Sequence, residues 1–327
     1  MKLPRILLPL TLFAATAAAV AAPACPELDA PPADVCVAGA HGVAYGRTRG
    51  DAEMGARAFE GAARHFRMYF GAEPPAGMLV LSRTYATEAA TVLATAHSLA
   101  YGLSWLPASA SPGWHPDASS RRRPGGPRRG PGPHEDVLRH ELGHAMYAAA
   151  FWPGAASEVP IYGSPAPDWL DEGVAMLMEA PESQQQRGAR FLATHRSSPG
   201  EVPPLAKFLV MPHPALALRE MMRRHGQRSR SGVISMELPP GDRTALALDM
   251  FYGQALVFAA FLIEASGDVR ILRSVSEAAA AGVDFEKWLA GPGESSSLPS
   301  TLPLLQARWD EWLKRMPERK NVPATSR

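Results

Sequence analysis

The sequence has 327 residues, of which 46% are hydrophobic, and its 33 basic side chains balance 32 acidic ones. A chain of this length and apolar content can bury a full core, which excludes a mini-protein held together by disulfides. The balanced charge provides no global attraction to nucleic acid or to an anionic membrane, so any charge-driven partner must bind locally. The 28 glycines and 32 prolines predict long loops between the ordered elements.

The first residues have the pattern of an export signal. Lys2 and Arg5 precede an apolar run that ends in small residues, as signal peptides do. We expect residues 1–22 to be a cleaved signal peptide and the remaining chain to be periplasmic or secreted, without a stable membrane anchor. The alternative is a retained anchor helix, which Pro9 and the lack of a basic stop-transfer flank disfavour.

Cys25 and Cys36 are the only cysteines. In an oxidising compartment, two cysteines this close together predict one short disulfide loop near the start of the exported chain. The alternative is two unrelated thiols. Neither cysteine belongs to a metal-binding CxxC pair.

Residues 23–106 have mixed α and β character. Apolar residues recur at helical spacing over 51–70, and the run GMLVLS at 77–82 predicts a buried strand. Residues 35–45 fit a strand or a loop, and residues 85–99 have a helix-like composition. This part is followed at 107–133 by a basic loop rich in proline and glycine, which lacks hydrophobic periodicity and is expected to be flexible.

Residues 134–327 have a mostly helical pattern. The fold class we expect is therefore α+β, in one domain with a small mixed N-terminal part and a mostly helical C-terminal half. No internal repeat of 20 to 50 residues is present, which argues against solenoids and propellers. Helices are predicted at 135–151, 169–179, 205–225 with breaks at prolines, 244–265, 268–281 and 302–316.

The segment VLRHELGHAMYAAAF contains an HExxH motif within a predicted helix. His140 and His144 are four residues apart, so they project from the same helix face, one turn apart, and two imidazoles placed in this way can share one zinc ion. Glu141 is rotated by about 100° from His140, which places its carboxylate beside the metal rather than on it. This position suits a general base.

A catalytic zinc site needs a third protein ligand. The metzincin pattern is excluded, because Tyr147 and Ala150 occupy the positions of its glycine and its third histidine. Downstream, the segment PDWLDEGVA predicts a new helix with Asp168 as its N-cap and Glu172 in its first turns. Glu172 is the natural third ligand.

Two features of the chain allow both helices to reach one metal. Residues 148–167 contain two glycines and four prolines, enough to reverse the chain direction. Gly143 and Gly173 lack side chains, so we expect the two helix backbones to approach each other closely at these glycines.

HELGH followed by WLDEG resembles the gluzincin peptidases, in particular the peptidase MA-like group. The segment FYGQA at 251–255 is similar to the tyrosine- and glutamine-bearing helix of that group, and the likeness extends to Trp309 and Trp312. It covers roughly residues 137–313, and it is strong only at the two metal motifs. The resemblance implies a zinc metalloprotease, a hydrolase that acts on peptide or protein substrates and binds one Zn²⁺ per chain.

By this resemblance His140, His144 and Glu172 bind zinc, and Glu141 activates the zinc-bound water that attacks the amide carbonyl. Tyr252 is our candidate donor to the developing oxyanion, although an ordinary buried tyrosine would fit the same position. Asp136 or Asp171 could orient a ligand histidine through its second ring nitrogen.

Two other functions fit the same residues. One is a catalytically inactive envelope binding or scaffold protein built on a peptidase fold, and the other is an amidase that acts on cell-wall peptides. Nothing in the sequence indicates the oligomeric state or the cleavage specificity.

Overall fold

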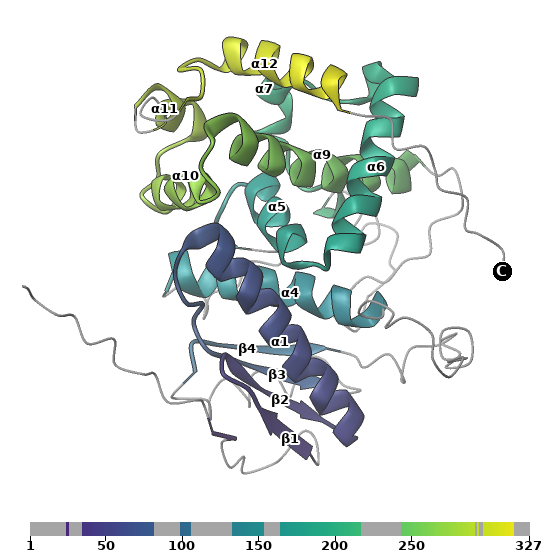
Figure 1. The fold of residues 1–327 in the computed structure, drawn as a ribbon, viewed down its shortest axis with the longest axis vertical. Helices are drawn as coiled ribbons and strands as arrows, with labels where there is room; N and C mark the ends of the chain where they lie inside the picture. The colour runs from purple at the N-terminus through teal and green to yellow at the C-terminus, as the bar shows by residue number, and fades with distance from the viewer. Residues whose placement is uncertain are drawn as a thin grey trace, which may run out of the picture.

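The computed structural model describes residues 24–25, 35–81, 99–105, 133–153, 164–216, 243–291, 293 and 297–316. The predicted signal peptide, residues 107–132 of the basic loop predicted at 107–133 and nearly all of the predicted helix at 85–99 lie outside these residues, while Pro133 is already helical. Figure 1 shows the sheet at one end of the long axis and the yellow C-terminal helix at the other, with the remaining helices alongside the sheet and between these two ends.

The sheet has four strands in the order β1-β2-β3-β4: Val35–Ala38, Gly42–Gly46, Gly77–Leu81 and Tyr101–Trp105. β1 runs antiparallel to β2, and the other two pairings are parallel. Every residue of β2 and β3 is buried, as expected for parallel strands with both faces covered. The predicted strand at 77–82 is confirmed and the 35–45 segment forms two strands, whereas β4 was not predicted.

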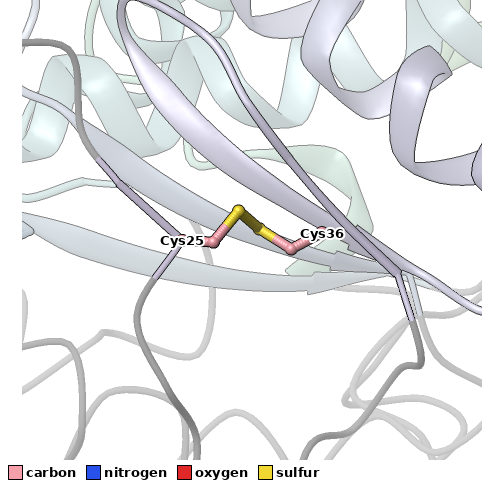
Figure 2. Close-up of a disulfide and its surroundings, with 2 residues drawn as sticks. All are labelled: Cys25 and Cys36. Carbon is pink, nitrogen blue, oxygen red and sulfur yellow. A yellow bond between two sulfur atoms is a disulfide. The ribbon is translucent and has the colours of Figure 1, made fainter.

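A disulfide joins Cys25 to Cys36 in β1, with their Cα atoms 6.2 Å apart (Figure 2). The predicted pairing of the two cysteines is therefore confirmed. Because Cys36 lies opposite Tyr45 of β2, the bridge ties the N-terminal segment to the sheet.

Helix α1 (Arg49–Phe70) connects β2 to β3 and packs against the sheet. Thr48 caps its N-terminus by accepting a hydrogen bond from the Asp51 N–H, and Gly71 ends it in the left-handed conformation with φ of 66°. The predicted helix at 51–70 is thus confirmed.

The remaining described elements are helices. Those at 133–151, 168–178, 243–266, 271–280 and 302–315 match predicted ones, whereas α6 and α11 were not predicted. Of the predicted helix at 205–225, α7 and a turn at 214–216 are described, and residues 217–225 lie outside the described part. The helices described after β4 have these bounds: α4 Pro133–Phe151, α5 Asp168–Met178, α6 Pro181–Ser197, the 3₁₀ turn η3 Pro199–Glu201, α7 Leu205–Phe208, α9 Arg243–Ser266, α10 Ile271–Ala280, α11 Phe285–Ala290 and α12 Leu302–Arg315.

One continuous hydrophobic core runs from α1 to α12, so the mixed part and the helical part share it. α9 lies in this core against α5 and α6. Its stretch Leu246–Ser266 is long and apolar enough to cross a membrane, but 61% of an 18-residue window within it is buried inside the protein. The core helix of a globular protein meets the same criteria. The coarse prediction of a mixed α/β, mostly helical fold with a small sheet is confirmed.

Candidate metal centre

The backbone of α5 lies close to α4 on one side and to α9 on the other. A Cβ atom added to Gly143 of α4 would lie 2.9 Å from the Cα of Ala175 in α5, so only glycine fits there without a shift. The predicted close approach is therefore found at Gly143. The prediction for Gly173 was wrong: its nearest neighbour is the Ala255 carbonyl oxygen of α9, 3.2 Å from an added Cβ.

This packing brings together the three predicted ligands. Nε2 of His140 lies 3.2 Å from Nε2 of His144 and 3.3 Å from Oε2 of Glu172. Nε2 of His144 lies 3.7 Å from Oε1 of Glu172, and ligand atoms of the three residues all lie within 4.8 Å of one another.

These spacings fit a divalent cation. Zinc binds nitrogen and oxygen at about 2.0–2.1 Å, so two ligands of a tetrahedral ion stand about 3.3 Å apart. Glu172 is fully buried, whereas the side chains of His140 and His144 keep 12% and 14% of their surface exposed.

The second ring nitrogen of His144 is oriented by Asp171. Its Nδ1 lies 2.8 Å from Oδ2 of Asp171, and the other oxygen of Asp171 accepts a hydrogen bond of 2.7 Å from the Ser164 hydroxyl. The suggestion that Asp171 could orient a ligand histidine therefore agrees with the structure. A proton on Nδ1 leaves the lone pair of Nε2 free to bind a metal.

Glu179, which was not predicted, plays the same part for His140. Its Oε1 lies 3.1 Å from Nδ1 of His140, and its Oε2 accepts a hydrogen bond of 2.9 Å from Nε of Arg187 on α6. Glu179 follows Glu172 by seven residues, two helical turns, so a search for acidic residues on the same helix face would have found it. Arg187 lies on α6, a helix that was not predicted, so no residue spacing in the sequence linked it to Glu179.

Two predictions about acidic residues were wrong. Asp136 does not face a ligand histidine; it accepts hydrogen bonds from the Ala180 N–H and the Ser183 hydroxyl at the start of α6. Asp168 is not an N-cap, because Pro167 occupies that position and Asp168 is already helical. Its carboxylate instead accepts a hydrogen bond of 2.7 Å from the His213 N–H.

The electrostatics of the centre favour a cation. Burial lowers the pKa of His140, but Glu172 and Glu179 outweigh this effect and raise the pKa to about 10. Burial also raises the pKa of Glu172, while the positive charges of His144 and His140 bring it down to about 2. In the metal-free protein Glu172 is thus ionised and His140 carries a proton, which a metal ion would replace.

Glu141 follows His140 on α4 and is partly buried. Burial raises its pKa, although the charges of His140 and His144 oppose the shift. A carboxylate with a raised pKa is a stronger base than one in water. This agrees with the role predicted for Glu141.

Tyr252 on α9 lies at the edge of the centre. Its ring centroid is 6.2 Å from that of His140, and the guanidinium of Arg187 lies 5.8 Å from the tyrosine ring centroid. The neighbouring Gln254 is fully buried and donates to the Pro203 carbonyl, so it joins α9 to the segment before α7. Of these two residues from the predicted FYGQA segment, only Tyr252 adjoins the ligands.

His213 is a further residue of the centre that the sequence did not reveal. Its Nε2 lies 3.4 Å from Oε1 of Glu172, and burial lowers its pKa to about 4. It follows α7 in a segment without spacing or periodicity that links it to HELGH. Only the tertiary fold brings it to Glu172.

No family model, no curated protein and no solved structure matches this chain significantly. The residues and geometry of the centre are therefore the basis for its function.

Proposed function

We propose that the chain is an exported zinc-dependent metallopeptidase of the gluzincin type. His140, His144 and Glu172 are its metal ligands, and Glu141 is its general base. The observation that carries this proposal is the spacing of 3.2 to 3.7 Å among the ligand atoms of two helices, which suits one tetrahedral ion.

A bound zinc ion would supply a Lewis acid that polarises the scissile carbonyl and makes water more acidic. Glu141 accepts the proton of the attacking water and passes it to the leaving amine. The Tyr252 hydroxyl donates a hydrogen bond to the developing oxyanion. Asp171 and Glu179 hold the protons on Nδ1 of the two histidines, so that both Nε2 atoms remain available as ligands.

Export is supported by the Cys25–Cys36 disulfide, because disulfides persist in oxidising compartments such as the periplasm or the extracellular space. The basic, apolar and small-residue pattern of residues 1–22 supports it independently.

The test is the zinc content of the purified protein by elemental analysis, for the wild type and for Glu172→Ala. We expect one zinc per chain in the wild type and a strong loss in the variant. Glu182→Ala serves as the matched control, because Glu182 is an exposed carboxylate on α6 and should leave the zinc content unchanged. A folded wild type that binds no supplied zinc would contradict the proposal and favour a scaffold protein.

Substrate assays separate the remaining alternatives. Hydrolysis of unfolded proteins or simple peptides supports a peptidase, whereas turnover restricted to cell-wall peptides supports an amidase. Zinc binding without any turnover supports an inactive peptidase fold.

A further inference from the structure

The ring of His213 is buried and is held in one orientation. The residue is 1% exposed, and its ring centroid lies 5.1 Å from that of Phe251 and 5.3 Å from that of Tyr252. Nδ1 accepts a hydrogen bond of 3.1 Å from the Ala215 N–H. Because Nδ1 accepts, the proton of the neutral ring is on Nε2.

This proton faces the metal-ligating carboxylate. Nε2 of His213 lies 3.4 Å from Oε1 of Glu172, while Oε2 of Glu172 lies 3.3 Å from Nε2 of His140. The two oxygens of the carboxylate thus have different nearest neighbours: the His213 donor lies nearest Oε1, with Nε2 of His144 farther away at 3.7 Å, and His140 lies near Oε2. A nitrogen that carries a proton has no lone pair for a metal.

Helix α5 also holds the backbone of His213. The His213 N–H donates to Oδ2 of Asp168 at 2.7 Å, and Asp168 precedes Glu172 by four residues, so both side chains project from the same face of α5. One helix therefore contacts His213 at its backbone and at its ring, which fixes the distance between the imidazole and Glu172.

We propose that His213 is a positioning residue that holds the Glu172 carboxylate so that Oε2 is presented to the metal. The inference rests on the proposed metal site and adds a residue that acts on the metal only through Glu172. Without the donor near Oε1, the carboxylate can rotate about the Cγ–Cδ bond of Glu172. Metal binding must then offset the conformational entropy that the carboxylate loses when it is fixed, and the metal affinity falls.

The experiment measures zinc affinity by competition with a chromophoric chelator. His213→Leu removes the donor and keeps an apolar side chain, whereas His213→Gln keeps an N–H donor. Loss of a group that orients a ligand costs about 10- to 100-fold in metal affinity, so we expect this loss in His213→Leu and recovery of most of it in His213→Gln. His195→Leu, on α6, is the control histidine and should bind zinc as the wild type does.

The outcomes separate the possible roles. Wild-type affinity in both His213 variants, with only a lower melting temperature of the metal-free protein, would mean a structural role and overturn the proposal. Affinity equally low in Leu and Gln variants would mean direct ligation and also overturn it. A wild type that binds no zinc would refute the proposed function, and this inference with it.

If His213→Leu does not fold, Asp168→Ala tests the same arrangement. It removes the acceptor of the His213 N–H and leaves the imidazole in place, so we expect weaker zinc binding with a smaller change than in His213→Leu. Unchanged affinity in a folded Asp168→Ala protein would overturn the proposal.

Discussion

Oδ2 of Asp171 lies 2.8 Å from Nδ1 of His144, while the next residue, Glu172, faces Nε2 of the same imidazole. Two neighbouring carboxylates on α5 thus contact opposite nitrogens of one ring. Successive helical residues are rotated by about 100°, so the two carboxylates can lie at opposite nitrogens of the ring, Asp171 at Nδ1 and Glu172 at Nε2.

Asp171→Asn tests the orienting role of this carboxylate. An amide keeps the size but can present its NH₂ group to Nδ1, which would favour the wrong tautomer, so we expect zinc affinity to fall about 10- to 100-fold. Competition with a chromophoric chelator measures the zinc affinity of the variant. Asp249→Asn, an exposed aspartate on α9, is the matched control, and equal affinities in the two variants would contradict the role of Asp171.

Glu141→Gln separates metal binding from catalysis. The variant keeps the three ligands, so its zinc content should equal that of the wild type, while hydrolysis should fall by about 10²- to 10⁴-fold, the usual contribution of a general base. Elemental analysis and a peptide-cleavage assay on the same sample measure both. Undiminished hydrolysis would rule out Glu141 as the base.

Gly143→Val tests the contact between α4 and α5. The new side chain would meet the Cα of Ala175, 2.9 Å from the Cβ position, and backbone cannot give way easily. Overpacking of this kind costs about 1–3 kcal/mol, which denaturant unfolding measures. Gly200→Val is the control, because nothing lies within 4 Å of an added Cβ there. Equal decreases in the free energy of unfolding of the two variants would mean that α4 and α5 are not in tight contact at Gly143.

Replacement of both cysteines by serine tests the disulfide between Cys25 and Cys36. Closing a loop of this size restricts the unfolded chain, and its removal costs about 3 kcal/mol in the chain-entropy model. Denaturant unfolding of the oxidised wild type and of Cys25→Ser/Cys36→Ser gives the comparison. The double variant should match the wild type measured in a reductant, and a difference between them would mean that the serines disturb packing around β1.

The sequence predicted the part of the centre that local periodicity encodes. His140 and His144 share a face because they are four residues apart, and Glu172 followed from the WLDEG segment and its resemblance to gluzincins. Its assignment as the third ligand agrees with the geometry of the centre, whereas the gluzincin family remains a proposal. His213 depends on a contact between segments 41 residues apart along the chain, as the positions of Glu172 and His213 show. Periodicity carries no information about such contacts.

The fold was predictable to a similar extent. Helix α1 has a clear apolar stripe at helical spacing, α9 is long and apolar over most of its length, and the buried run of β3 lies between turn residues. β4 has the sequence YGLSW and is as short as β3, but Gly102 and Ser104 interrupt its apolar residues, so it lacks the continuous apolar run of β3. Helix α6 has one buried residue, Phe191, so it lacks an apolar stripe that could reveal it.

Tyr252→Phe tests the predicted oxyanion donor. If the hydroxyl stabilises charge that develops only in the transition state, kcat should fall by about 10²- to 10³-fold, while KM and zinc content stay close to wild-type values. Tyr147→Phe is the matched control: its buried hydroxyl donates to Ser276 at 2.9 Å, so its loss should lower stability by about 1 kcal/mol without changing kcat. Steady-state kinetics and thermal unfolding of both variants provide the measurements. Equal kcat values for Tyr252→Phe and the wild type would show that the oxyanion is stabilised by other groups, and would restrict Tyr252 to packing against His140 and Arg187.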